Sequence, residues 1–237
     1  MSAAVLDLRV RWLGRMDFPD ALALQEEIVL KKRCDRSVED QLLLLEHEPV
    51  YTIGRTPDQS SLSGRRTAGR IRRGELGAGH LPHPLFVINR GGQATYHGPG
   101  QLIGYPIIDL RGCGQDLHKY LRWLEQLLID LLAEYGIAAS RRESLTGVWI
   151  GDRKIASIGV GVRHWITMHG FALNVSGDLS PFDHIVPCGI NNVAMTSMER
   201  ETDAAFSVTR VAALIEKLAL HRIGDLRVIR KAQPINV

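Results

Sequence analysis

Two residues, Cys188 and Lys154, have the side chains and the surroundings that nucleophilic catalysis needs. Cys188 lies between Pro187, which restricts the backbone, and Gly189, which leaves space beside the thiol. A cysteine attacks as its thiolate, and a neighbouring cation stabilises that form. Lys154 opens a largely apolar segment and would supply such a cation if its side chain turned inward. From residue types alone, a small buried cysteine and a solvated lysine at a strand edge stay open as alternatives.

A glycine-rich polar segment, residues 90–101, is a candidate ligand wall. Its glycines let backbone N–H groups approach a ligand and form an oxygen-binding concavity. The segment also carries an arginine, a tyrosine and a histidine. It lies between apolar runs at residues 85–88 and 102–110, which we interpret as neighbouring strands. The alternative is a tight hairpin whose glycines serve only the turn, although the segment has more polar side chains than a turn needs.

The other reactive side chains allow ordinary structural roles. His97 and His169 are possible bases, or histidines of the core. Cys34, at the end of a predicted helix, and Cys113, in a predicted turn, are expected to be small buried hydrophobic residues. The three cysteines have no metal-ligand spacing, so we predict no metal site. Their odd number favours free thiols in a reducing cytoplasm.

The composition is that of an ordinary globular protein. The chain has 237 residues, of which 45% are hydrophobic and 23% charged, and its net charge is +3. It has no internal repeat or linker, which predicts a single domain over residues 1–237. No apolar run approaches the roughly 20 residues that span a membrane, and charged Asp7 and Arg9 argue against a signal peptide. No basic stretch alternates with aromatic residues, so we expect no nucleic-acid partner.

Hydrophobic periodicity predicts both helices and strands. Helices are expected over residues 19–32, 117–135 and 207–221, with Asp17, Asp116 and Ser207 as their N-caps. Strands are expected at residues 6–12, 42–45, 147–150, 154–162, 165–175 and 226–229, the fifth broken at His169 and Gly170. The pair Gly151-Asp152 predicts a tight turn between two of the strands.

A basic loop is predicted at about residues 55–84. Its arginines alternate with glycine, serine and proline, and few apolar residues interrupt them. Loops beyond about 15 residues without structure of their own are usually functional or disordered. The loop is therefore either a solvated mobile segment or a docking surface for an acidic partner.

Several blocks of the sequence resemble, in the same order, the lipoyl(octanoyl) transferase family. They are residues 47–54 (HEPVYTIG), 90–101 (RGGQATYHGPGQ), 151–159 (GDRKIASIG), 169–175 (HGFALNV) and 185–190 (IVPCGI). The resemblance extends over nearly the whole chain. One departure is the loop around residues 62–84, which looks longer and more basic than the family's usual connection.

The resemblance implies an α+β fold, a mixed β-sheet with packed helices similar to the catalytic domain of biotin and lipoate ligases. It also implies transfer of an octanoyl or lipoyl group from acyl carrier protein, through a cysteine thioester, to a specific lysine of a lipoyl domain. Such domains belong to 2-oxoacid dehydrogenase complexes and to the glycine cleavage H protein. This activity is the first step of endogenous protein lipoylation, takes place in the cytoplasm and requires no cofactor.

The family's functional residues match positions of this sequence. The nucleophile corresponds to Cys188 and the lysine that activates it to Lys154. The substrate-binding residues correspond to Arg90, Gly91, Gly92, Gln93, Ala94, Thr95, Tyr96, His97, Ser157, Ile158, Gly159, Gly170, Phe171 and Ala172.

Two other functions remain open. An ATP-dependent lipoate or biotin-type protein ligase shares the fold, but it activates a free acid and needs no nucleophilic cysteine. The chain has neither the arginine-glycine pattern of biotin ligases nor the triple glycine of lipoate ligases. The second alternative is a non-catalytic module that binds an acidic protein through the basic loop.

Overall fold

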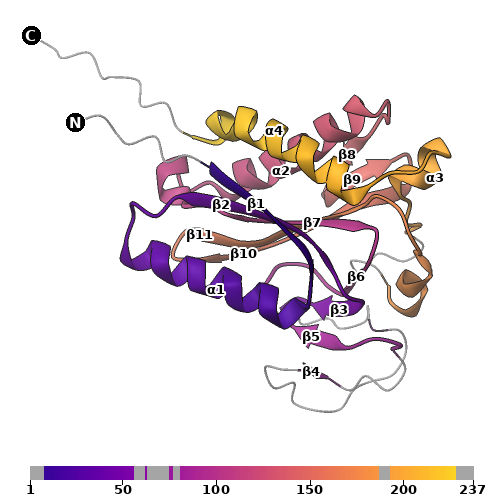
Figure 1. Cartoon of the computed structure of the whole chain (residues 1–237), viewed down its shortest axis with the longest axis horizontal. Coiled ribbons are helices and arrows are strands. Elements are labelled where there is room, and N and C mark those ends of the chain that lie inside the picture. The colour runs from indigo at the N-terminus through magenta and orange to yellow at the C-terminus, as the bar shows by residue number, and fades with distance from the viewer. Residues whose placement is uncertain (1–7, 56–61, 63–74, 77–80, 187–192, 228–237) are drawn as a thin grey trace, which may run out of the picture.

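The computed structural model describes residues 8–55, 62, 75–76, 81–186 and 193–227, and its elements form two sheets flanked by helices (Figure 1). The large sheet has seven strands in the order β1-β2-β7-β11-β10-β9-β8, and the small sheet has four in the order β4-β5-β3-β6. The strands are β1 (Leu8–Met16), β2 (Asp40–His47), β3 (Val50–Ile53), β4 (Glu75–Leu76), β5 (Leu85–Val87), β6 (Thr95–His97), β7 (Gln101–Ile107), β8 (Ser140–Arg142), β9 (Leu145–Ile150), β10 (Arg153–Arg163) and β11 (Ile166–Asn174).

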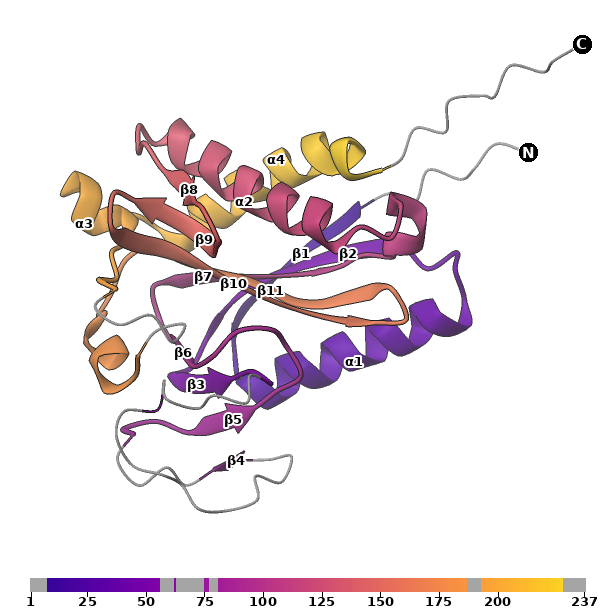
Figure 2. The same ribbon diagram turned by 180° about the vertical axis from the view of Figure 1, so that it is seen from behind.

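The helices cover both faces of the large sheet (Figure 2). The α-helices are α1 (Phe18–Cys34), α2 (Leu117–Glu134), α3 (Met198–Thr202) and α4 (Val208–Leu226), with short 3₁₀ helices η1 (Leu110–Cys113) and η2 (Ser180–His184). In both views α2 and α4 lie on one face of the sheet and α1 lies on the other. Strands β1 and β2 are parallel, whereas the other neighbours in the large sheet are antiparallel. The expected α+β fold with a mixed sheet is confirmed.

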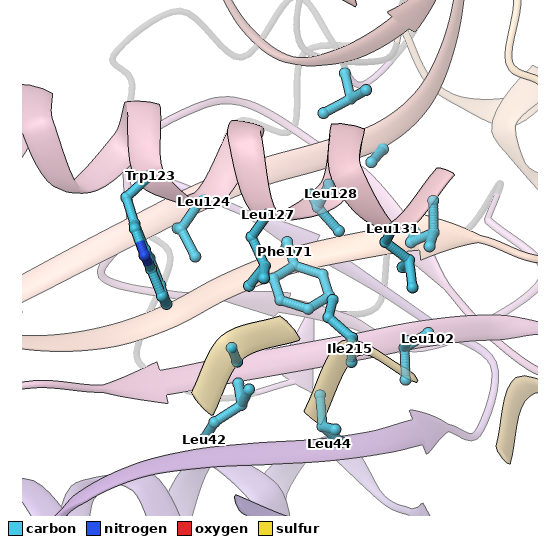
Figure 3. Close-up of a cluster of buried hydrophobic side chains, with 14 of the residues drawn as sticks. Leu42, Leu44, Leu102, Trp123, Leu124, Leu127, Leu128, Leu131, Phe171 and Ile215 are labelled. Atoms are coloured by element: carbon cyan, nitrogen blue, oxygen red, sulfur yellow. The ribbon is translucent and has the colours of Figure 1, made fainter. Parts of the chain in front are cut away.

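The larger core lies between the sheet and helices α2 and α4. Asp116 caps α2 by accepting a hydrogen bond from the backbone N–H of Lys119 at 2.9 Å. The leucines of α2 then recur on one face and point toward Phe171 of β11 (Figure 3). Burial of these apolar side chains is the main force that holds the helix on the sheet. It also fixes β10 and β11, which carry the predicted site segments.

The strands that flank the glycine-rich segment are not neighbours, contrary to the sequence-based interpretation. Strand β5 belongs to the small sheet and β7 to the large one, where it pairs with β2 and β11. Between them, residues 95–97 form a strand of their own, β6, which pairs with β3. The segment therefore crosses from one sheet to the other, and the hairpin alternative is wrong as well.

Other differences concern element ends and caps. Residues 166–174 form one uninterrupted strand, because the pairing of His169 with Val160 is kept although His169 has a left-handed φ of 56°. Asp17 and Ser207 occupy N-cap positions without a side-chain hydrogen bond. Helix α4 extends to Leu226, so that residue is not in a strand, and residues 228–229 lie outside the described part of the chain. The sequence patterns also missed β8 and α3.

In the described residues, helices that could cross a membrane are absent. Cys113 is buried as expected, whereas Cys34 is exposed at the end of α1, so the expectation for Cys34 was wrong. Most of the basic loop lies outside the described residues. Within it, the short strand β4 pairs antiparallel with β5.

Candidate active site

A cavity, which we call the acyl cavity, lies where β10 and β11 face the start of α1 and the β5–β6 connection. It brings together the three segments that the sequence singled out: residues 90–97, 157–159 and 170–172. Its walls are formed by Phe18, Ile88, Arg90, Gly92, Gln93, Thr95, His97, Tyr105, Ser157, Ile158, Gly159, His169, Gly170, Phe171 and Ala172. Gly91, Ala94 and Tyr96, also predicted to bind substrate, do not line it. Ala94 and Tyr96 pack in the core of the small sheet.

Arg90 holds the glycine-rich segment in place. Its guanidinium is buried and donates to the carbonyls of Gly91 at 3.0 Å, Gln93 at 2.9 Å and Thr52 at 3.0 Å. The backbone N–H of Gly91 donates in turn to the carbonyl of Val160 in β10 at 2.9 Å. These bonds join the segment to the large sheet, so its glycines form a fixed wall of the acyl cavity.

The glycine-rich segment packs so closely against its neighbours that two facing positions leave no room for a side chain. A Cβ atom on Gly159 would lie 2.9 Å from Cδ of Arg90. A Cβ atom on Gly54, directly after β3, would lie 2.1 Å from the carbonyl oxygen of Gly92. Side chains at these positions would push the segment away from the sheet and widen the cavity.

Hydrogen bonds determine the proton positions on two histidines beside the cavity. Nδ1 of His47 lies 2.8 Å from the carbonyl oxygen of Met16, so it carries the proton, and Nε2 accepts from the Tyr105 hydroxyl at 2.7 Å. His97 Nδ1 lies 3.2 Å from Oε1 of Gln101. The Gln101 amide nitrogen donates to the carbonyl of Tyr96, which leaves Oε1 to accept from His97.

Burial keeps the histidines around the cavity neutral. It lowers the pKa of His47 to about 4 and that of His169 to about 3. It also lowers the pKa of His97 well below the ordinary value, and the charge of Arg90 contributes. Burial raises the pKa of the Tyr105 hydroxyl. At neutral pH the cavity wall therefore has uncharged histidine rings.

We expect the free energy of unfolding to fall between pH 6.5 and pH 4.5. Histidines of the unfolded chain take up protons near pH 6.5, whereas His47 in the folded protein does so only near pH 4. Folding lowers these pKa values, so their contribution is fully present above pH 6.5 and is lost as the pH falls toward the folded values. Each such histidine contributes a slope of up to about 1.4 kcal/mol per pH unit.

Urea unfolding at a series of pH values measures this slope. Carboxylates whose pKa folding lowers, such as Glu201, begin to affect stability only within about one pH unit of their ordinary value of 4.5, so the upper part of this pH range reports the histidines. His47→Gln should reduce the slope. A free energy of unfolding that stays constant from pH 7 to pH 5 would contradict the neutral state of these rings.

Lys154 lies inward, which resolves the question left by the sequence. Only 2% of its surface is exposed, and its Nζ lies 5.2 Å from the centre of the Trp149 ring on the paired strand β9. The backbone of Lys154 donates to the carbonyl of Ala194 at 2.9 Å and accepts from the N–H of Thr196 at 3.0 Å. The segment 194–196 is thus attached to the strand that carries the lysine.

Lys154 lines a further cavity of about 340 Å³, which we call the lysine cavity. It adjoins the acyl cavity, because Gly92, Ile158 and Gly159 line both. The remaining walls are Gly91, Leu117, Leu121, Ser144, Leu145, Thr146 and Val160. Cys188 lies outside the described residues.

Sequence reasoning missed several residues of the site. Phe18 and Ile88 belong to ordinary apolar runs, and nothing in the sequence distinguishes them. Gln101 and Asn174 fall inside the blocks that resemble the transferase family, and their side chains hydrogen-bond at 3.0 Å. Asn174 also donates to the carbonyl of Thr196 at 2.9 Å. A buried chain of polar contacts therefore connects His97 with the segment attached to Lys154.

Solved structures that superpose on this chain include lipoate-protein ligases and biotin protein ligases. A lipoate-protein ligase A bound with ATP superposes with a TM-score of 0.66 at 14% identity, over 92% of this chain and 86% of that chain. The biotin protein ligase from Aquifex aeolicus gives a TM-score of 0.52 at 12% identity, over 92% and 69% of the respective chains. These likenesses define the class of fold, the lipoate and biotin ligase catalytic domain.

The sequence comparisons are more specific. Residues 17–219 match the lipoyl protein ligase A/B catalytic domain. The octanoyltransferase of Geobacter sulfurreducens is 47% identical over 206 residues, which cover 86% of this chain and 79% of the relative. That of Solibacter usitatus is 45% identical over 216 residues, covering 91% and 87%. The chain therefore belongs to the lipoyl protein ligase A/B catalytic-domain family and, within it, to the octanoyltransferases.

Proposed function

We propose that the protein transfers an octanoyl group from acyl carrier protein to a specific lysine of lipoyl domains, through a thioester on Cys188. One observation carries this proposal: the buried Lys154 lies beside a cavity formed by the three predicted substrate segments. The described residues on either side of the Cys188 segment support it. Ile185 packs in the core of the small sheet, and Ala194 hydrogen-bonds to Lys154.

In the first step, the Cys188 thiolate attacks the thioester carbonyl of the donor. A new thioester forms on Cys188, and the thiolate of the carrier's prosthetic arm leaves. One thioester replaces another, so the step is nearly isoenergetic and needs no ATP. The Lys154 ammonium stabilises the attacking thiolate.

In the second step, the amine of the acceptor lysine attacks the octanoyl-Cys188 carbonyl. An amide forms, the Cys188 thiolate leaves, and the proton of the amine passes to a base. A free lysine has a pKa near 10.4, so a positioned base is needed at neutral pH. We assign this role to Lys154, whose ammonium gives its proton to the departing carrier thiolate in the first step, so that the carrier leaves as a thiol and Lys154 is left as a neutral amine.

The acyl cavity suits the hydrocarbon chain. Phe18, Ile88 and Phe171 provide apolar walls, and the histidine rings are neutral. Each buried methylene contributes about 0.8 kcal/mol of binding. The volume of the acyl cavity is about 50 Å³, small beside the adjoining lysine cavity of about 340 Å³, so the length of the acyl group that it accepts is restricted.

The acceptors we propose are lipoyl domains of 2-oxoacid dehydrogenase complexes and the glycine cleavage H protein. The donor is octanoyl-acyl carrier protein, and we place the reaction in the cytoplasm. We treat residues 1–237 as one catalytic domain, of which residues 17–219 match the family.

A transfer assay without ATP tests the proposed function. Octanoyl-carrier protein and a lipoyl domain are mixed with the protein, and octanoyl-lipoyl domain is measured by mass spectrometry. Product is expected without ATP and without free octanoate. Product that forms only from free octanoate and ATP would instead show an ATP-dependent ligase, and binding without any product would show a non-catalytic module.

The basic loop gives a further prediction. If the arginines within residues 65–73 attract the acidic carrier protein, reversing several of their charges should lower the association rate, and added salt should have the same effect. Stopped-flow measurement of association gives this rate. Transfer from preformed octanoyl-enzyme to the acceptor serves as the control and should not change. An association rate that is independent of salt would contradict the docking role.

A further inference from the structure

A third cavity lies beyond the acyl cavity, on the side away from Lys154. We call it the outer cavity. It has a volume of about 290 Å³, and its lining includes Leu22, Ala23, Phe86, Ile88, Met168 and His169. Ile88 and His169 line both this cavity and the acyl cavity. These two side chains therefore form the wall between them.

The cavities follow one another along the β10–β11 hairpin. Strand β10 passes Lys154 first, then Ser157 to Gly159 at the acyl cavity, and ends with Arg163 at the outer cavity. A chain whose carbonyl lies near Lys154 thus has its methyl end toward the shared wall. We infer that Ile88, together with the His169 ring, is the chain-length gate of the acyl cavity. This inference rests on the proposed function.

The Ile88 side of the wall is rigid. Ile88 is buried, and its backbone N–H donates to the carbonyl of Ile53 at 2.9 Å. Its side chain packs in a cluster with Phe18 and Val50, and Phe86 packs against that cluster. A Cβ atom on Gly161 would lie 2.5 Å from the carbonyl oxygen of Asn89, so the chain after Ile88 lies directly on β10.

The His169 side is held by a dedicated contact. His169 has a left-handed φ of 56°, which a residue with a side chain rarely adopts. Its backbone N–H donates to Oε1 of the buried Gln25 in α1 at 2.8 Å. Its ring lies edge-on to Tyr105, with 6.4 Å between the ring centres. These contacts hold the backbone of His169 and place its ring against Tyr105, which also lines the acyl cavity.

The far side of this wall can accept an apolar chain. Leu22, Phe86 and Met168 contribute apolar surface to the outer cavity, and Glu26 and Arg163 form an ion pair of 3.8 Å at partly exposed positions. Shortening Ile88 would join the two cavities. The outer cavity would then accept the methyl end of acyl groups longer than eight carbons.

The test compares kcat/KM for octanoyl-, decanoyl- and dodecanoyl-carrier protein. In Ile88→Ala, the ratio of decanoyl to octanoyl transfer should rise roughly tenfold or more, because each added methylene that becomes buried contributes about fourfold. Ile88→Val, a milder change, should shift the ratio in the same direction by less. It keeps the test valid if circular dichroism shows that Ile88→Ala does not fold.

Ala23 offers a matched control. It is exposed on α1, and it lines the outer cavity but not the acyl cavity. Ala23→Phe alone should leave octanoyl transfer unchanged, and added to Ile88→Ala it should restore the wild-type ratio by filling the outer cavity. If folded Ile88→Ala and Ile88→Val transfer octanoyl groups with an unchanged chain-length profile, the role of Ile88 as the gate is overturned. The proposed function is not affected by that result. Absence of octanoyl transfer by the wild-type protein would overturn the proposed function itself.

Discussion

Replacing Cys188 by serine is expected to lower octanoyl transfer by a factor on the order of 10³ or more. A serine hydroxyl keeps its proton at neutral pH, so it is a far weaker nucleophile than a thiolate beside a lysine. The rate of octanoyl-lipoyl domain formation, followed by mass spectrometry, measures the loss. Full activity of this variant would contradict the mechanism.

The other two cysteines provide the controls. Cys34 is exposed at the end of α1, and neither cavity of the proposed site includes it. Burial raises the pKa of Cys113 to about 11, so this residue is a protonated thiol at neutral pH. Cys34→Ser and Cys113→Ser are therefore expected to keep most of the activity.

The second large effect is expected from Lys154→Arg, which should separate the two half-reactions. Arginine keeps the positive charge but does not deprotonate near neutral pH. We expect this variant to form some octanoyl-Cys188 and then to transfer the group more slowly by a factor on the order of 10² or more. Lys154→Ala should be poor in both steps, because it has neither the cation nor the amine.

Single-turnover mass spectrometry follows the acyl-enzyme in these variants. Accumulation is expected with arginine and not with alanine. If the arginine variant transfers the group at the wild-type rate, Lys154 is not the base. His97 or His169 is then the next candidate, although burial lowers the pKa of both.

The sequence allowed prediction of features that depend on local patterns. Helix α2 follows from its leucine periodicity and from Asp116, and the structure confirms Asp116 as the N-cap. The turn between β9 and β10 follows from the pair Gly151-Asp152, and the two strands are paired. The assignment of β5 and β7 to one sheet failed, because local sequence does not specify which distant strand is the partner.

The sequence predicted only the part of the site that does not depend on how distant segments pack. Residues 90–97, 157–159 and 170–172 were found by resemblance, whereas the inward position of Lys154 required the structure. The pairing of β9 and β10 shifts between Lys154 and Ala156, and such a bulge changes which face a side chain occupies. Simple alternation along the strand therefore does not determine the direction of Lys154. Phe18 reaches the acyl cavity only through the packing of α1 on the sheet.

The central claim, a covalent octanoyl intermediate on Cys188, is tested most directly by the mass of the intact protein. The protein is mixed with octanoyl-carrier protein in the absence of acceptor, and the modified peptide is then identified. We expect one octanoyl group, located on Cys188 and sensitive to hydroxylamine. Added lipoyl domain should remove it at least as fast as the steady-state turnover. Transfer without this intermediate, or an octanoyl group on another residue, would contradict the mechanism.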